Sequence, residues 1–227
     1  MKRGKKYRKL TKNIDKSKIY SLEEAIKKVK ELSYSKFVGT LELHMDLNIP
    51  KDKDAKSIKG SISLPYSTEV QDIKIAVFTD DKVDEAKKAG ADLIGLDNLI
   101  KDVKEGKINF DIAIATPSAM SKMATIGKEL GPKGLMPNPK TGTVTEDIES
   151  TIQEYRKGKQ TFTCDSSGVI HMGVGKLDMK DEKLIENIHE AVKAIEAAVG
   201  KNYVQIINKL HLSPTMGSSV KVRYSRE

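Results

Sequence analysis

Residues 130–144 are the stretch that most constrains how this chain can fold. They read Leu-Gly-Pro-Lys-Gly-Leu-Met-Pro-Asn-Pro-Lys-Thr-Gly-Thr-Val. Proline lacks the backbone amide donor and glycine has no side chain to restrict its dihedral angles, so we expect neither a helix nor a central strand to persist here. Because a residue before proline is pushed toward an extended backbone, Gly131, Met136 and Asn138 should be extended and the loop should be stiff.

Two interpretations of this loop are open. It is either a structural connector that is rich in turn residues, or a phosphate cradle in which Lys133 and Lys140 act as counter-ions. No Gly-x-x-x-x-Gly-Lys-Ser/Thr and no Gly-x-Gly-x-x-Gly motif occurs in the chain. Nucleotide binding therefore has little support from the motifs.

The composition excludes several classes of protein. No apolar run approaches the ~20 residues that span a bilayer, and the basic N-terminus is not followed by the apolar segment of a signal peptide. A single cysteine, Cys164, allows no intramolecular disulfide and no thiolate metal site of its own. We expect a cytoplasmic protein without contact to a membrane.

The formal net charge of +8 is unevenly distributed along the chain. Residues 1–67 hold 17 Lys and Arg against 8 Asp and Glu, residues 68–158 hold 13 against 16, and residues 159–227 hold 10 against 8. Basic ends around an acidic middle indicate that the terminal segments bind a polyanion. The basic segment 2–12 itself is either part of that surface or a solvated tail.

Periodicity predicts helices and strands in both terminal parts of the chain. A capping box at Ser21 opens a helix to Leu32, and apolar side chains alternate from Phe37 to Ile49, as in a half-buried strand. The next strand, 58–64, should form a hairpin with it across a charged turn at 51–56. Further strands are expected at 161–164, 169–172, 203–212 and 220–224, with a helix at 181–199.

The middle of the chain has a different pattern, in which buried-type strands alternate with helices. This alternation is typical of a parallel, doubly wound sheet. Asn98 and Ser118 are the expected N-caps of the second and third helices. The strands are expected at 73–78, 93–96 and 110–115, and the helices at 82–89, 99–105, 119–126 and 147–157.

The two patterns predict a nested arrangement of domains. Residues 1–67 and 159–227 form one discontinuous α+β domain with an antiparallel sheet and helices. Residues 68–158 form an inserted α/β Rossmann-like domain with a parallel sheet. Two crossings of the chain would then act as a hinge.

The sequence offers no recognisable catalytic or metal site. Its four histidines, His44, His171, His189 and His211, are scattered, and none has a His or Cys partner at the spacing of metal ligands. On the residues alone, a structural role is favoured for His171. The residues point to a binding protein rather than an enzyme.

Four motifs taken together identify a family. They are 131–140 with 142–144, Ala89-Gly-Ala-Asp92, Gly168-Val-Ile-His171 with Gly175-Lys176, and Pro214-Thr-Met-Gly217. With them the chain resembles the L-one family of large-subunit ribosomal proteins, the proteins of the mobile stalk, in its bacterial form. The resemblance runs from about Arg8 to the C-terminus, and the long loop is highly specific to the family.

The resemblance implies that the discontinuous domain binds large-subunit ribosomal RNA at the base of the stalk. It also implies that the protein helps deacylated transfer RNA leave the exit site. In many bacteria such proteins repress translation by binding a similar structure in their own messenger RNA. It further implies no enzymatic activity, no cofactor, no metal, and a monomer within the cytoplasmic ribosome.

The family's RNA-contacting residues correspond to Phe37, Thr215, Met216 and Gly217. Phe37 can press on a ribose or a base, Thr215 can hydrogen-bond a 2′-hydroxyl, and Gly217 lets the backbone approach RNA closely. Their expected neighbours in the interface are Lys36, Thr40, Glu42, His171 and Lys176. The resemblance assigns no role to the loop residues Gly131, Pro132, Lys133, Gly134, Pro137, Asn138, Pro139, Lys140 and Gly142.

The chain departs from the family pattern at two places, and its sequence leaves two other functions open. The segment 67–72 lacks a glycine that is common in relatives, which affects the expected hinge, and Lys209 replaces a frequent serine, which adds charge near the RNA face. One alternative function is a ribosome assembly factor or RNA chaperone on the same fold. The other is a nucleotide-using enzyme whose inserted domain holds a small ligand with the long loop.

Overall fold

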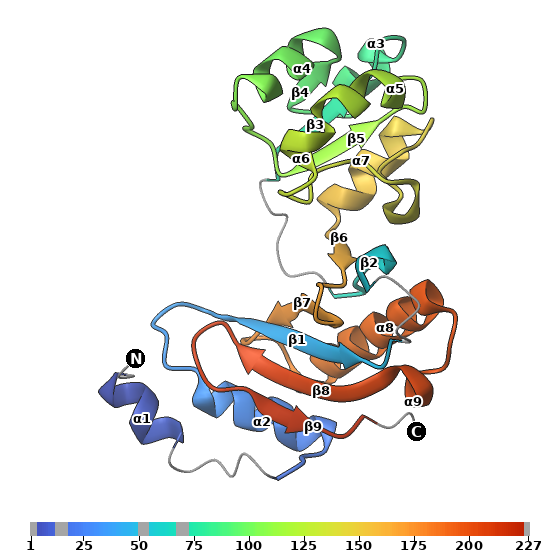
Figure 1. Ribbon diagram of the computed structural model, residues 1–227. Coiled ribbons are helices and arrows are strands. Elements are labelled where there is room, and N and C mark those ends of the chain that lie inside the picture. Colours follow the sequence, from blue (N-terminus) through green and yellow to red (C-terminus); the bar gives the residue numbers. More distant parts are fainter. Residues whose placement is uncertain (1–3, 12–17, 50–54, 67–72, 225–227) are drawn as a thin grey trace. The chain divides into compact units, whose positions relative to one another are not determined.

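The computed structural model describes residues 4–11, 18–49, 55–66 and 73–224 (Figure 1). Within the basic N-terminal segment, helix α1 spans Lys5–Thr11. Residues 12–17, most of the expected charged turn at 51–56 and the segment 67–72 lie outside the described residues; a short 3₁₀ helix, η1, follows at Ala55–Ser57. The chain divides into two compact units, Met1–Thr68 with Phe162–Glu227, and Glu69–Thr161.

The first unit is built on a four-stranded antiparallel sheet in the order β7-β1-β8-β9. Strand β1 (Thr40–Leu47) lies between β7 (Val169–Lys176) and β8 (Ile207–Pro214), and β9 (Val220–Val222) pairs with β8. Buried and half-buried side chains alternate along β1, as the sequence predicts for a strand with one face toward a core. The predicted α+β architecture is confirmed.

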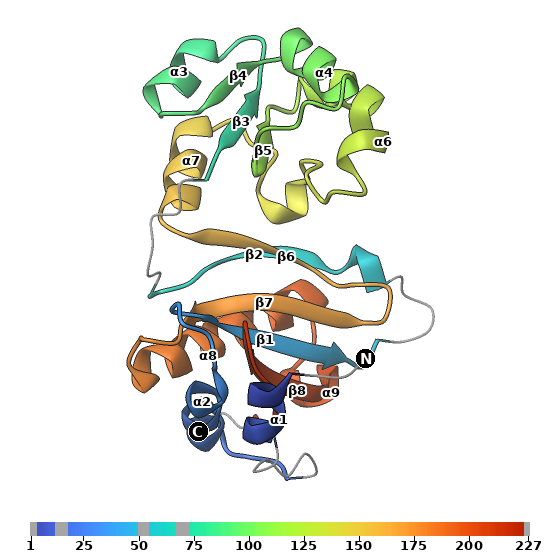
Figure 2. The same ribbon diagram turned by 90° about the vertical axis from the view of Figure 1, so that its left-hand side faces the viewer.

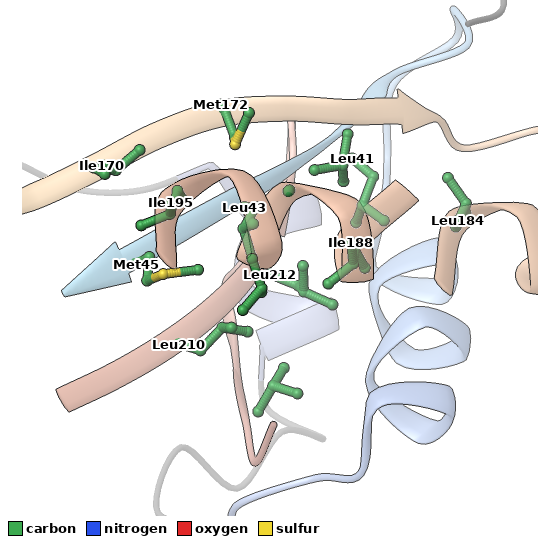
Figure 3. Packing of buried hydrophobic residues seen from close by; sticks show 14 of the residues in the cluster. Leu41, Leu43, Met45, Ile170, Met172, Leu184, Ile188, Ile195, Leu210 and Leu212 are labelled. Atoms are coloured by element: carbon green, nitrogen blue, oxygen red, sulfur yellow. The ribbon is translucent and has the colours of Figure 1, made fainter. Parts of the chain in front are cut away.

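Helices α2 (Leu22–Leu32) and α8 (Asp181–Val199) lie on the same side of this sheet (Figure 2). The Ser21 side chain accepts a hydrogen bond from the Glu24 backbone nitrogen, and α8 ends at Gly200 in the left-handed conformation (φ 74°), so both predicted helices are confirmed. Figure 3 shows the packed core, to which β1, β7, β8 and α8 contribute Leu41, Leu43, Met45, Ile170, Met172, Leu184, Ile188, Ile195, Leu210 and Leu212.

The predicted hairpin is wrong. Strand β2 (Lys59–Ser63) pairs with β6 (Lys159–Thr163) in a separate two-stranded sheet and not with β1. The buried ring of Phe162 lies over Gly60, where a Cβ atom would come within 2.6 Å of its Cζ. This close packing between segments a hundred residues apart outweighs the closeness of the two strands in sequence.

Two other strands begin later than predicted. The expected strand 203–212 starts with a helical turn, α9 (Tyr203–Ile206), because the Asn202 side chain caps it by accepting from the Val204 backbone nitrogen. The strand expected from Phe37 begins only at Thr40, which leaves Phe37 outside the sheet.

The second unit contains a parallel sheet in the order β4-β3-β5, which confirms the predicted α/β architecture. Two separate apolar clusters cover the two faces of β3. One cluster contains Phe78 and the other contains Val77. Its strands are β3 (Ile75–Phe78), β4 (Leu93–Gly95) and β5 (Ile112–Ala115), and its helices are α3 (Val83–Lys88), α4 (Asp97–Lys104), α5 (Met120–Met123), η2 (Ala124–Ile126), α6 (Gly127–Leu130), η3 (Pro139–Thr141) and α7 (Ile148–Arg156).

Neither predicted cap in this unit is correct. Helix α4 begins at Asp97, so Asn98 is already inside it. The Ser118 hydroxyl lies 3.0 Å from the Thr116 hydroxyl instead of capping a helix, and the predicted helix 119–126 is divided into α5 and η2. In the part of the chain that the structure describes, no helix is both long and apolar enough to cross a membrane.

Candidate nucleic-acid interface

One face of the four-stranded sheet is polar, while the other packs on the core. Alternation along β1 assigns its polar side chains to this face, and directly opposite residues of antiparallel strands share a face. The residues of this polar surface are all at least partly exposed. We call this surface the polar face, and it comprises Thr40, Glu42, His44, Asp46, His171, Gly173, Lys176, Lys209, His211, Ser213 and Lys221.

Two loops are joined where β1 begins. The backbone nitrogen of Thr40 donates to Thr215 Oγ1 (2.9 Å), and the backbone nitrogen of Thr215 donates to the Thr40 carbonyl (3.0 Å). The hydroxyl of Thr215 donates to the same carbonyl (3.2 Å), and the Tyr34 backbone nitrogen donates to the Met216 carbonyl (3.4 Å). These bonds hold the loop before β1 (residues 33–39) against the loop after β8 (residues 215–219), and so bring together residues 175 positions apart. We call these two segments the joined loops.

These joined loops expose large apolar side chains. Phe37 is 60% exposed, Val38 53% and Met216 40%, whereas most apolar side chains of this unit are buried. The Ser35 hydroxyl donates to the Phe37 carbonyl (2.8 Å), which holds the loop backbone beside the exposed Lys36. Apolar and aromatic surface beside a cation suits contact with bases, riboses and phosphates of RNA.

Gly217 has a reason within the protein to lack a side chain. A Cβ atom there would lie 2.4 Å from Pro214 Cγ and 2.9 Å from the Leu32 carbonyl oxygen. Close packing of the loop against the end of α2 therefore already requires glycine. From the sequence alone, only a close approach of RNA is expected to require this glycine.

Three of the four histidines are not scattered, which corrects the sequence interpretation. His44 on β1 is the register partner of both His171 on β7 and His211 on β8. The Nδ1 atoms of His44 and His171 are 2.7 Å apart, and their ring centroids are 5.0 Å apart. The side chain of His171 is 55% exposed, so it is a surface residue rather than a buried structural one.

The surroundings of His44 and His211 favour the neutral form of these two rings. Burial and the neighbouring His171 lower the pKa of His44, against the opposing effect of Glu42, whose Oε2 is 3.6 Å from His44 Nε2. Burial together with Lys221 and Lys209 lowers the pKa of His211. Glu42 is thereby explained as a partner of His44 on the same strand.

Other groups of chemical interest do not form a reactive centre. Burial raises the pKa of the Cys164 thiol to about 11, so it is protonated at neutral pH and is a poor nucleophile. Among residues 4–11, 18–49, 55–66 and 73–224, no group of three or more His, Cys, Asp or Glu side chains could hold a metal ion.

The long loop belongs to the second unit and is folded around Asn138. The Asn138 carbonyl accepts from the hydroxyls of Thr141 and Thr143, and its side chain accepts from the Lys140 backbone nitrogen. Asn138 is extended as predicted (φ −141°, ψ 134°). Gly131 is not: it is helical (φ −58°, ψ −53°), because its backbone nitrogen continues α6 with a bond to the Gly127 carbonyl.

The end of this loop after Asn138 is fixed by its own hydrogen bonds. After Asn138 the chain forms η3, and its polar groups bond one another; Gly142 takes the left-handed conformation (φ 67°) that ends this turn, and the Thr143 carbonyl accepts from the Ala115 backbone nitrogen (2.9 Å). This end is a structural connector to β5. Pro137 is buried, whereas Gly131, Pro132, Lys133, Gly134, Pro139 and Lys140 are exposed.

Comparison with known proteins identifies the family. Residues 26–218 match the model of the Ribosomal protein L1p/L10e family. This chain belongs to that family. The matched range includes the joined loops, the polar face up to Ser213 and the long loop, and it confirms the resemblance seen in the sequence.

Curated relatives of the L1p/L10e family match over nearly their whole length. The large ribosomal subunit protein uL1 of Thermosipho africanus is 42% identical, with 97% of this chain and 96% of that protein covered. The uL1 of Kosmotoga olearia is 38% identical (99% and 98% covered), and that of Rickettsia canadensis is 40% identical (96% and 92% covered).

Proposed function

We propose that this chain is a constituent of the large ribosomal subunit that binds ribosomal RNA at the mobile stalk. The observation that carries the proposal is the group of exposed apolar side chains beside the polar face, in a chain whose relatives are named large ribosomal subunit proteins. The binding domain comprises residues 1–67 and 159–227, into which the domain 68–158 is inserted.

Different side chains at the joined loops contact different parts of the RNA. Phe37 and Met216 pack on bases or riboses, and Lys36 meets a phosphate. Thr40 and the Thr215 hydroxyl contact 2′-hydroxyl groups of a folded RNA. Gly217 has no side chain and so lets the loop backbone approach the RNA closely. Lys176, the register partner of Thr40, and the exposed His171 extend the phosphate contacts along β7.

The distribution of charge supports this division between the domains. The excess of basic residues lies in 1–67, and the inserted domain is acidic overall. An acidic domain is repelled by the RNA backbone, so it contributes little to affinity. Its role lies elsewhere on the stalk, where the protein assists release of deacylated transfer RNA from the exit site.

The same surface accounts for translational repression. A messenger RNA that folds like the stalk base meets the same loops and the same polar face, and one copy of the protein cannot hold both RNAs at once. Ribosomal RNA therefore withdraws the protein from its own messenger. No enzymatic step is part of this function.

A salt series on the whole protein tests the proposal. Affinity is measured for a folded fragment of the stalk base of large-subunit ribosomal RNA and for a plain RNA duplex of equal length. Binding to the fragment that survives salt levels at which the duplex is released supports recognition of a folded shape. Equal and equally salt-sensitive binding to both RNAs contradicts it.

A second measurement distinguishes a ribosomal constituent from an assembly factor on the same fold. Large subunits that carry the protein are washed in high salt and sedimented. A constituent remains at one copy per subunit in mature particles, whereas an assembly factor is found only with immature ones.

A further inference from the structure

The three histidines of the polar face form a row that crosses the sheet. His171, His44 and His211 are register partners on β7, β1 and β8, and Lys221 on β9 is the partner of His211. Neighbouring strands are ~4.8 Å apart, so the three histidines span roughly 10 Å, and Lys221 extends the line to roughly 14 Å. It is continuous with the proposed RNA interface, because Thr40 and Glu42 precede His44 on the same face of β1.

The contact between His44 and His171 exists in only some protonation states. A hydrogen bond between two Nδ1 atoms needs one nitrogen that carries a proton and one that does not. When both rings are fully protonated, both nitrogens are donors and both rings are positive, so this bond breaks. Protonation of the pair therefore frees the exposed ring of His171 to turn toward a negatively charged partner.

Charged groups surround the row on every strand. Glu42 Oε2 lies 3.6 Å from His44 Nε2, and Asp165 Oδ2, in the turn before β7, lies 3.7 Å from His171 Nε2. Asp46 pairs in register with Lys209, and Lys221 stands beside His211. Carboxylates support protonation of the rings and the two lysines oppose it, so a bound anion shifts the balance toward the charged state.

We infer that His171, His44 and His211 form a proton-coupled phosphate-binding strip, in which an RNA backbone laid across the sheet draws protons onto the row. The inference rests on the proposed function, which places RNA on the polar face. On binding, the bond between His44 and His171 gives way to contacts from imidazolium groups to phosphate oxygens. Because linkage is reciprocal, a lower pH strengthens RNA binding as much as RNA binding favours protonation.

The test compares affinity for the stalk-base fragment at pH 7.5 and pH 6.0, at constant ionic strength. Whole protein is compared with the double variant His44→Gln/His211→Gln and with the control His189→Gln, which changes the fourth histidine, on α8. Affinity of the wild type and of the control is expected to rise about three- to tenfold at the lower pH, as for one or more coupled protonations. The double variant is expected to respond clearly less than the wild type, because His171 is the one ring of the row that it retains.

The outcomes separate this inference from the proposed function. A double variant that keeps the wild-type response to pH, while the wild type still prefers the fragment to a duplex, overturns only the proton-coupled strip. A wild type without that preference at either pH overturns both. Calorimetry of the wild type in two buffers of different ionisation enthalpy measures how many protons are taken up on binding, and it does not depend on the variant folding. Binding at pH 6.5 without net proton uptake also overturns the strip.

Discussion

The hydroxyl of Thr215 lies 2.9 Å from the backbone nitrogen of Thr40 and 3.2 Å from the carbonyl oxygen of the same residue. Its proton goes to the carbonyl and one lone pair accepts from the amide, so one lone pair is left for another partner. The hydroxyl can therefore accept a hydrogen bond from a 2′-hydroxyl of RNA while it holds the two loops together.

Thr215→Val removes this hydroxyl at nearly constant volume. We expect the free energy of unfolding to fall by about 1 kcal/mol, since the Thr40 amide loses its acceptor at a site that water can reach. RNA affinity should fall as well. Thr215→Ser keeps the hydroxyl and should retain both properties. Urea unfolding and RNA titration of the two variants check this. Equal stability and equal RNA affinity of Thr215→Val and Thr215→Ser would show that the hydroxyl is unimportant.

Gly217→Ala should destabilise the first unit without any change in charge. The added Cβ atom overlaps Pro214 and the Leu32 carbonyl, and strain of this kind costs about 1–3 kcal/mol. The matched control is Gly127→Ala, because a Cβ atom there meets nothing within 4 Å and its φ is −62°. Denaturant unfolding should show a loss for Gly217→Ala only; two equally stable variants would contradict the packing account.

Much of this fold could be predicted because its signals are local. The apolar stripe that ends at Gly200 defines α8, the alternation after Thr40 defines β1, and short buried strands between helices define the parallel sheet. Each of these features depends on neighbours within a few positions. The loop residues Thr215 and Met216 could be named only through the family resemblance.

Features that depend on pairing between distant segments could not be predicted. Whether β2 pairs with β1 or with β6 is decided by the fit of Phe162 onto Gly60, and periodicity contains no information on that fit. The row from His171 to His211 exists only because β7 and β8 both flank β1 in a particular register. Knowledge of the register would have been the signal that revealed it.

The stability of the first unit should decrease as the pH falls below about 6.5. The pKa values of His44 and His211 are lowered in the folded protein, chiefly by burial, so the unfolded chain binds more protons in this range. Their contribution is fully present above the usual value of 6.5 and is lost as the pH falls through the folded values. Urea midpoints at pH 7.5 and pH 5.5 should differ less in His44→Gln/His211→Gln than in the wild type, and an unchanged difference would contradict the account.

Tyr155→Phe should loosen the long loop of the second unit. The buried Tyr155 hydroxyl donates to the Thr141 carbonyl (3.2 Å), and burial raises its pKa to about 12. Loss of this bond should cost about 0.5–1.5 kcal/mol and increase hydrogen exchange at 138–143, while RNA affinity stays unchanged. A marked loss of RNA affinity would mean that the inserted domain takes part in binding.

The most direct test of the central claim is the affinity of Phe37→Ala/Met216→Ala for the stalk-base fragment. Phe37 is 60% exposed and Met216 40%, so thermal stability should be largely retained, while binding should weaken by about 2 kcal/mol or more through lost packing on bases and riboses. The matched control is Val204→Ala, which shortens an apolar side chain that is 71% exposed on α9, away from the joined loops. A large loss confined to the double variant supports the interface described above; wild-type affinity in the double variant would contradict it.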